Sequence, residues 1–315
     1  MHMRIGVDIM GGDFAPQTTV LGSFLARDQI PEDVELILIG DRESIIRISQ
    51  DNGFDVNKVS IVHASEQILM SDHPYKAFTT KLDSSIVKGF KMLKAGEIDA
   101  FCSAGNTGAM LIGASKVIAP IPGIIRPAIT AILPNLTGTP NVLLDVGINP
   151  DSRPDVLYQY GILGSIYSKA MFNVSQPRVG LVNLGSEDEK GNLVTKAAFQ
   201  LMKDNKDYNF VGNVEGNEFF NNQKTEVLVC DGFVGNIILK QAEGFYHLVR
   251  DRGIQDEYFE EFNFENFGGT PVLGINSPVI VGHGISNDIA IKNMILNSWT
   301  VCKSNLINNI KAALE

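Results

Sequence analysis

The chain has 315 residues and a formal net charge of −10; 44% of its residues are hydrophobic and 20% are charged. This length and composition are typical of a globular protein with one large α/β domain or two closely joined ones. The negative charge argues against nucleic acid as a partner, so an anionic substrate must be held by a local site.

The cysteines and the apolar runs favour a cytoplasmic location. Cys102, Cys230 and Cys302 lie far apart and form no C-x-x-C pair, which argues against a disulfide framework or a thiolate metal site. No apolar run approaches the roughly 18 residues that a membrane-spanning helix needs. We interpret residues 1–3 as an added remnant ahead of a natural start at Met3.

Short apolar runs alternate with amphipathic stretches along the chain. The predicted strands are residues 4–8, 35–39, 59–62, 100–103, 142–145, 179–183, 226–229 and 279–281, and the clearest helices are 16–25, 109–118 and 287–314. Several strands are apolar at consecutive positions, which predicts a mostly parallel sheet with helices on both faces. Prolines at 120, 122, 127 and 134 break the rhythm where a subdomain or dimer element could begin. Because no linker is apparent, we expect residues 1–315 to form a single domain.

Many of the predicted strands end in a polar side chain. Ligands of open parallel sheets bind at the carboxyl ends of the strands. We therefore expect these side chains to share one rim: Asp8, Ser103, Asp145, Asn183, Asp231 and His283.

The segment Ser-Ala-Gly-Asn-Thr-Gly joins a predicted strand to a predicted helix. Backbone N–H groups at a helix start, with hydroxyl and amide side chains beside them, form a ready anion site. We therefore predict that phosphate binds to Ser103, Gly105, Asn106, Thr107 and Gly108. A helix cap with glycines for tight packing is the alternative. Neither a Walker A loop nor a G-x-G-x-x-G fingerprint is present.

Two further strand ends are candidates for substrate binding. Asp8 precedes Gly11 and Gly12, which allow the backbone to approach a ligand or another segment closely. His283 lies in a Gly-His-Gly-Ile-Ser-Asn segment, although a lone histidine is more often a structural side chain.

The side chains best suited to catalysis lie in two other loops. Lys190 stands in an acidic loop, where it could hold an anionic nucleophile or belong to a solvated charge run. Asp231, Gly235 and Asn236 follow a strand and begin a helix, so the Asn236 amide could face a ligand. No paired metal-ligand spacing and no nucleophile elbow occur, and we interpret Cys102 as a buried, inert thiol.

These motifs and others occur in a fixed order over nearly the whole chain: VDIMGGDFAP, SAGNTGAML, RPAI, LLDVGIN, RVGLVNLG with KGN, NVEG, CDGFVGNIILK, GGTPVLG and GHGISN. In this respect the chain closely resembles the PlsX family of phosphate acyltransferases. The resemblance implies a three-layer α/β/α, Rossmann-like fold similar to isocitrate and isopropylmalate dehydrogenases and to phosphotransacetylases, in a homodimer.

The resemblance also implies an activity. Inorganic phosphate attacks the thioester of a fatty acyl group on acyl carrier protein, giving acyl phosphate for phospholipid synthesis without a metal or organic cofactor. A separate glycerol-3-phosphate acyltransferase uses the product at the membrane. By the same resemblance, Lys190 and Asn236 are the catalytic pair.

Two other functions stay open from the sequence. One is a phosphotransacetylase-like or reductase-complex acyltransferase that uses acyl-CoA or a protein-bound acetyl group. The other is a non-catalytic regulator that binds a phosphoryl ligand. A nicotinamide dehydrogenase is disfavoured, because the chain lacks a dinucleotide fingerprint and a carboxylate cluster for a divalent metal.

Some features bear on partners and on departures from the family. Ile148 stands where the family usually has a small residue, and the segment 245–267, the family's amphipathic tip, is shortened. This segment has two arginines against six acidic residues, so we expect only weak peripheral contact with the inner face of the membrane. Lys81, Lys88 and Lys91 have helical spacing, which predicts a face that docks the carrier, with a solvated face as the alternative.

Overall fold

The computed structural model describes residues 2–136, 138–221 and 224–314, and the chain divides into two compact units. The first unit comprises Met1–Pro120 and Phe264–Lys303, and the second comprises Ile121–Asn263 and Ser304–Glu315. The first boundary follows Pro120, in the proline-rich stretch where the sequence predicts a break. That residues 1–315 behave as one domain stays a prediction.

The sheet of the first unit has the strand order β3-β2-β1-β4-β11-β10. Neighbouring strands pair in parallel, except that β10 runs antiparallel to β11. The strands are β1 (Met3–Asp8), β2 (Val34–Gly40), β3 (Ser60–His63), β4 (Ala100–Ser103), β10 (Gly269–Leu273) and β11 (Val279–Gly282). The helices are α1 (Gln17–Arg27), α2 (Arg42–Asp51), α3 (Pro74–Thr80), α4 (Ser85–Ala95), α5 (Thr107–Ile112) with a π-helical continuation (Gly113–Ile118), and α10 (Asp288–Lys303).

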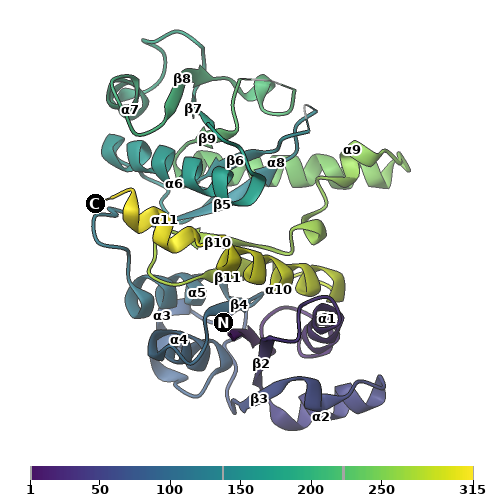
Figure 1. Ribbon diagram of the computed structural model, residues 1–315. Helices are drawn as coiled ribbons and strands as arrows, with labels where there is room; N and C mark the ends of the chain where they lie inside the picture. The colour runs from purple at the N-terminus through teal and green to yellow at the C-terminus, as the bar shows by residue number, and fades with distance from the viewer. Residues whose placement is uncertain (1, 137, 222–223, 315) are drawn as a thin grey trace. The chain divides into compact units, whose positions relative to one another are not determined.

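Helices cover both faces of this sheet (Figure 1). On one face, Val7 and Cys102 belong to a buried cluster with side chains of α1 and α10. On the other face, α4 approaches so closely that a Cβ on Gly89 would lie 2.1 Å from the ring of Phe101. Because Phe101 and Cys102 are consecutive and fully buried, the apolar run in β4 has the pattern expected of a doubly covered parallel strand.

Within the second unit, the strands follow the order β5-β6-β9-β7-β8. β6, β9, β7 and β8 are parallel, and β5 is antiparallel to β6. The strands are β5 (Ala128–Leu133), β6 (Asn141–Leu144), β7 (Arg178–Val182), β8 (Asn209–Val214) and β9 (Val227–Val229). The helices are α6 (Pro154–Phe172), α7 (Leu193–Lys203), α8 (Gly232–Asp251), α9 (Glu257–Glu260) and α11 (Leu306–Ala312).

Consecutive residues of β6 contact different helices. A Cβ on Gly164 of α6 would lie 2.9 Å from the Leu144 side chain. Leu143 instead belongs to a buried cluster that includes Ala242 of α8, and Ile238 of α8 packs against this cluster. Both sheets are therefore mostly parallel and have helices on both faces, as the sequence predicts.

The structure corrects two predictions about helices. The expected helix 287–314 is interrupted: α10 ends at Lys303, and α11 begins after Asn305, whose φ of 56° is left-handed and cannot continue a helix. Nor do Lys81, Lys88 and Lys91 share a helix, because Lys81 follows the end of α3 while the other two lie on α4.

These lysines also make contacts within the first unit. Lys81 Nζ lies 2.6 Å from an Asp72 carboxylate oxygen, and Lys88 Nζ lies 2.7 Å from one of Asp83. The premise of one shared helix is therefore wrong, and docking of the carrier by these lysines stays a prediction that their spacing no longer supports.

The strands β5, β8 and β10 are missing from the predicted set. β5 follows the proline cluster, β8 contains Gly212, and β10 reads Gly-Thr-Pro-Val-Leu. Glycine and proline have low strand propensity, so tertiary pairing rather than local sequence explains β8 and β10, whereas β5 is an apolar run with the composition of a strand.

Candidate active site

In the first unit, the Asp8 carboxylate joins the ends of two neighbouring strands. Asp8 is fully buried at the end of β1, and Ser103 is fully buried at the end of β4. The Ser103 hydroxyl donates to Asp8 Oδ2 over 2.6 Å and accepts from the Gly105 N–H over 2.9 Å. The Met10 N–H also donates to Asp8, over 3.0 Å. The carboxylate therefore fixes the start of the predicted phosphate turn.

The surroundings of Asp8 change its acidity. Burial raises the pKa of this carboxyl above 3.8, whereas hydrogen bonds from Ser103 and Ser85 act in the opposite direction and offset only part of the effect. Burial disfavours the ionised carboxylate and hydrogen-bond donors favour it. The charge of Asp8 thus depends on these donors being in place.

Gly11 and Gly12 let two segments approach the turn. A Cβ on Gly11 would lie 2.3 Å from Asp8 Oδ2 and 2.7 Å from the Gly105 nitrogen. Gly12 has a φ of 113°, which favours glycine. The next N–H, of Asp13, donates to the Gly284 carbonyl over 2.7 Å. Both glycines thus belong to the packed backbone around Asp8.

The later residues of the turn differ in what they can offer a ligand. Asn106 is buried; its Oδ1 accepts from the Ala109 N–H, and its Nδ2 donates to the carbonyls of Leu69 and Asp72. Its side chain therefore caps α5 and holds a neighbouring loop. Thr107 is exposed at the start of α5. A Cβ on Gly108 would lie 2.4 Å from Pro74, so this glycine allows α3 to pack against α5.

His283 follows β11, which is parallel to β4, so it lies at the same sheet edge as Asp8 and Ser103. Its ring packs against Phe264 with 4.8 Å between ring centroids. Its carbonyl accepts the Ser286 hydroxyl over 2.6 Å. These contacts give His283 a structural role at this edge of the sheet. A direct role of His283 in substrate binding stays a prediction.

In the second unit, Lys190 lies in a loop held by amide side chains. Asn183 Nδ2 donates to the Lys190 carbonyl and to Asn213 Oδ1, and Asn213 Nδ2 donates to the Glu187 carbonyl, over 2.8 to 3.1 Å. The Lys190 side chain is 43% exposed, and its Nζ lies 3.8 Å from Glu187 Oε1. The lysine thus carries an accessible charge on a loop whose backbone is fixed.

Asn236 lies in the first turns of α8, and its side chain is held by a different loop. Asp231 caps this helix, because its Oδ1 accepts the Val234 N–H over 2.8 Å. A Cβ on Gly235 would lie 1.9 Å from the Asp145 carbonyl oxygen. The exposed Asn236 donates through Nδ2 to the Val146 carbonyl over 3.2 Å. The helix start is therefore in direct contact with the loop that follows β6.

The loops of both catalytic candidates follow parallel strands of the second sheet. Lys190 is on the loop after β7, Asn236 follows β9, and β9 lies between β6 and β7. Within each unit, the polar strand ends therefore share one edge of that unit's sheet, as expected. Lys190 and Asn236 are held by separate networks, with Asn183 and Asn213 around the first and Asp145 beside the second.

Sequence reasoning did not name Asp145, Asn149, Asn183 and Asn213 as site residues. Asp145 and Asn183 were identified as polar strand ends, and Asn149 and Asn213 lie in the LLDVGIN and NVEG stretches. The signal for Asp145 and Asn183 is therefore a position directly after an apolar strand, whereas for Asn149 and Asn213 it is only membership of these stretches. Among the residues that the structure describes, no group of three or more His, Cys, Asp or Glu side chains is placed to hold a metal ion.

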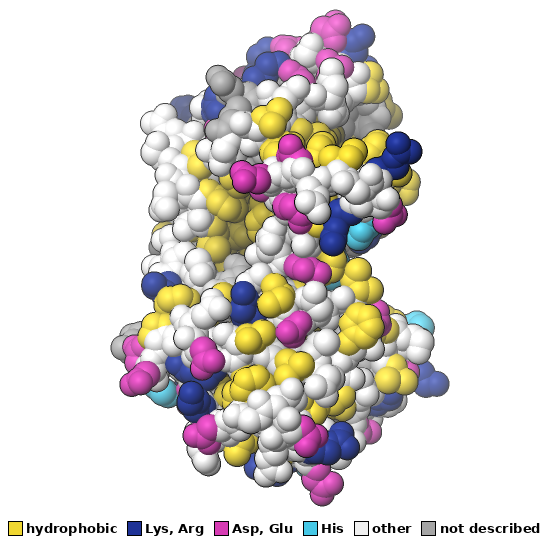
Figure 2. Space-filling view, turned by 90° about the vertical axis from the view of Figure 1, so that its right-hand side faces the viewer, with side chains coloured by type: hydrophobic (Ala, Val, Ile, Leu, Met, Phe, Trp, Pro, Cys, Tyr) yellow, Lys and Arg dark blue, Asp and Glu magenta, His cyan; other side chains and the backbone are white. Residues whose placement is uncertain are grey.

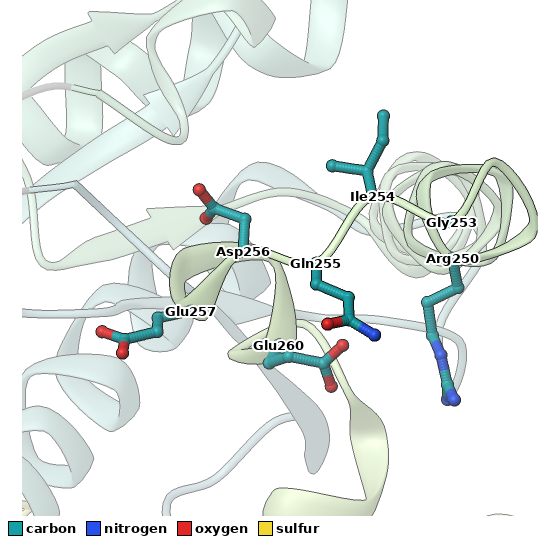
Figure 3. Close-up of a pocket in the computed structure, with 7 residues that line it drawn as sticks. All are labelled: Arg250, Gly253, Ile254, Gln255, Asp256, Glu257 and Glu260. Carbon is teal, nitrogen blue, oxygen red and sulfur yellow. The ribbon is translucent and has the colours of Figure 1, made fainter.

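A hollow of about 640 Å³ opens where α8 ends (Figure 3). Its lining has three carboxylates and one guanidinium, in the set Arg250, Gly253, Ile254, Gln255, Asp256, Glu257 and Glu260. The Tyr246 hydroxyl donates to the Glu260 carboxylate over 3.0 Å. An excess of carboxylates repels an anion, and none of these residues is a predicted site residue. We therefore do not assign phosphate binding to this hollow.

The aromatic side chains of the segment 245–267 divide into buried and exposed ones. Phe262 packs against Phe220 with 5.4 Å between ring centroids, and Tyr246 is buried, whereas Phe245 and Phe259 are 57% and 37% exposed. Figure 2 shows acidic and basic side chains interspersed over one face, with no extended basic patch there. None of the helices in the described residues meets the length and hydropathy needed to span a bilayer.

Solved structures define the fold class. A phosphotransacetylase from Streptococcus pyogenes superimposes with a TM-score of 0.65 and 18% identity, covering 95% of this chain and 94% of that one. The EutD phosphotransacetylase from Staphylococcus aureus gives a TM-score of 0.62 and 15% identity, covering 96% and 94%. The chain therefore has the α/β fold of the phosphotransacetylases.

Sequence relatives identify the family. The model of the family described as "Fatty acid synthesis protein" matches residues 3–309. A phosphate acyltransferase from Halothermothrix orenii is 41% identical over 333 aligned positions, covering 99% of each chain. The chain is an acyltransferase. It belongs to the fatty acid synthesis protein family, the PlsX family, as the resemblance implied.

Proposed function

We propose that the chain transfers a fatty acyl group from acyl carrier protein to inorganic phosphate, and that the acyl phosphate serves phospholipid synthesis. The observation that carries this proposal is 41% identity, over nearly the full length, to a protein named phosphate acyltransferase. The phosphate oxygen forms a bond to the thioester carbonyl carbon, the C–S bond breaks, and the carrier thiolate leaves and takes up a proton.

The cysteines support direct attack by phosphate rather than an acyl-cysteine intermediate. Cys102 and Cys230 are buried, and burial raises the pKa of Cys102 to about 12 and that of Cys230 well above 9.0. Burial also raises the pKa of the Cys302 thiol to about 12. Because the thiolate is the nucleophilic form of cysteine, none of these thiols is activated for acyl transfer.

In this proposal, the candidate site residues have different roles in the reaction. The Lys190 ammonium holds the phosphate anion and favours its more nucleophilic ionisation state. The Asn236 amide steadies the nucleophile or the oxyanion that develops on the carbonyl, and one preorganised donor of this kind is worth about 2.7–4 kcal/mol. The turn from Ser103 to Gly108 binds phosphate through its backbone N–H groups and the Thr107 hydroxyl.

The proposal extends to partners and location. Acyl carrier protein delivers the substrate, the enzyme acts as a homodimer in the cytoplasm, and a glycerol-3-phosphate acyltransferase consumes the product. The two exposed aromatic side chains Phe245 and Phe259 support weak peripheral contact with the inner face of the membrane, because aromatic rings partition into the bilayer interface.

Release of free thiol from a long-chain acyl carrier protein, measured with and without inorganic phosphate, tests this function. We expect release that depends on both phosphate and enzyme, and that is slower when acyl-CoA replaces the acylated carrier. A clear preference for acyl-CoA would favour the phosphotransacetylase-like alternative. Phosphate binding without turnover of either thioester would favour the non-catalytic regulator.

A further inference from the structure

The Asp145 carboxylate gathers hydrogen-bond donors from separate backbone segments of the second unit. Asp145 is fully buried directly after β6. Its Oδ1 accepts the N–H groups of Ile129 and Ile148 over 3.1 and 3.3 Å, and its Oδ2 accepts the backbone N–H and the side-chain amide of Asn149 over 2.6 and 3.1 Å. The carboxylate thus closes the loop 145–149 on itself and ties it to β5.

The same residue contacts the start of α8. The Gly232 N–H donates to the Asn149 carbonyl over 2.8 Å. Cβ atoms on Gly232 and Gly235 would lie 2.8 Å from Asp145 Oδ2 and 1.9 Å from its carbonyl oxygen. Real side chains do not approach this closely, so both glycines are required for the first turn of α8 to rest on the Asp145 loop.

This contact orients the Asn236 amide. Its Nδ2 donates to the carbonyl of Val146, the residue directly after Asp145, over 3.2 Å. An amide group has two N–H donors and one carbonyl oxygen, so the bond to Val146 sets its plane and leaves a donor and an acceptor for a ligand. The direction of those groups therefore depends on where the Asp145 loop holds the Val146 carbonyl.

We propose that Asp145 is a positioning residue for the reaction: it fixes the loop 145–149 and the first turn of α8 so that the Asn236 amide faces the reacting phosphate and acyl groups. This inference rests on the proposed function. It also explains why a carboxylate is needed, because the site presents four donors to two oxygen atoms. An asparagine would put an NH₂ group opposite two of them and force the loop to move.

The energetics of the carboxyl agree with this geometry. Burial raises the pKa of Asp145, and the hydrogen bonds from Asn149, Ile129 and Ile148 offset part of the effect. A buried carboxylate stays ionised only while its donors remain aligned. The ionised Asp145 carboxylate therefore holds the loop 145–149 in place, and the N–H donors of that loop keep the carboxylate ionised.

The test compares Asp145→Asn with Asn141→Asp, an isosteric exchange at the other end of the same strand. Asn141 is also fully buried, donates to the Phe219 carbonyl over 2.7 Å and accepts from the Thr225 hydroxyl. Asp145→Asn should lower kcat roughly 10- to 100-fold, on the scale of a misplaced catalytic group, with a smaller change in KM for phosphate. Asn141→Asp should lower Tm and leave kcat within about 2-fold, because its side chain bonds to Phe219 and Thr225 rather than to the loop 145–149 or the first turn of α8.

A double-mutant cycle separates positioning from general damage. In an Asn236→Ala background, Asp145→Asn should change kcat by less than about 2-fold, because the group it positions is already absent. Amide hydrogen exchange should show faster exchange at 146–149 and 232–236 in Asp145→Asn and unchanged exchange there in Asn141→Asp. Fully additive effects on kcat, or an unchanged kcat in Asp145→Asn, would overturn the proposal.

A second variant, Asn149→Ala, tests the proposal if Asp145→Asn does not fold. Asn149→Ala keeps the carboxylate but removes the side-chain amide that donates to Asp145 and to the Tyr160 hydroxyl oxygen. We expect a smaller fall in kcat in the same direction and the same loss of effect in the Asn236→Ala background. An unchanged kcat there would overturn the proposal as well. If Asn236→Ala itself leaves kcat unchanged, the proposed catalytic part of Asn236 fails, whereas the exchange data still report whether Asp145 holds the loop.

Discussion

Replacing Lys190 by alanine separates catalysis from stability. Among the described residues the lysine forms one ion pair, with 3.8 Å between Nζ and Glu187 Oε1, and the two side chains are 43% and 56% exposed. Exposed pairs of this kind are worth at most about 1 kcal/mol. A loss of that size lowers Tm by no more than about 2–4 °C in a chain of this length. If Lys190 holds phosphate during attack, its loss removes a preorganised group worth about 2.7–4 kcal/mol, a 100- to 1000-fold fall in kcat/KM.

A matched control exists at the end of α7, where Lys203 pairs with an acidic residue of the same loop. Lys203 Nζ lies 2.6 Å from Asp188 Oδ2, and these side chains are 53% and 55% exposed. Lys203→Ala therefore removes another exposed ion pair to the acidic loop without touching a predicted site residue. Thiol release from acyl carrier protein and thermal unfolding should be measured for both variants. We expect similar small Tm changes in the two, with the large loss of activity confined to Lys190→Ala.

Two outcomes would refute this reasoning. Equal activity in the two lysine variants would mean that Lys190 contributes only surface charge, as its acidic neighbours suggest for a solvated loop. A large fall in Tm in Lys190→Ala would mean that the side chain stabilises the loop more than its one exposed pair allows, so that lost activity would reflect lost structure.

Three further results are expected. Burial raises the pKa of Asp8 above 3.8, so the folded state binds this proton more tightly and wild-type stability falls as pH rises above that value. The Tm of Asp8→Asn relative to wild type should therefore increase as pH rises through the folded-state pKa, and a difference that is constant with pH would contradict the raised pKa. Gly11→Ala would place Cβ 2.3 Å from Asp8 and 2.7 Å from the Gly105 nitrogen, so it should cost about 1–3 kcal/mol and weaken phosphate binding, whereas Gly244→Ala, with nothing within 4 Å, should not destabilise. In liposome flotation, the protein should bind only weakly to liposomes through the segment 245–267. Strong binding of the protein that grows with anionic lipid and vanishes in salt would rule out our interpretation.

The sequence predicts most of the parallel strands because their apolar runs are local and unambiguous. Residues 100–103 match β4 in full, and 4–8 and 279–281 differ from β1 and β11 by one residue at one end. It fails where long-range contacts override local preference. The strand β10 forms despite its glycine and proline. The break at Asn305, between α10 and α11, has a local cause instead, because asparagine adopts the left-handed conformation more readily than most non-glycine residues.

The candidate site shows the same division between local and tertiary information. Four asparagines lie in polar segments at or near strand ends, but they differ in burial: Asn106 and Asn213 are buried, Asn183 is partly buried, and Asn236 is exposed. The partners that bury them are far along the chain, for example 37 residues from Asn106 to Leu69 and 30 from Asn183 to Asn213. Residue type and glycine spacing indicate that such a segment is polar and tightly turned. They do not determine which side-chain amide forms its hydrogen bonds within the protein. Only the strand pairing within each unit, which brings that unit's strand ends together, decides which amide stays available for phosphate or a thioester.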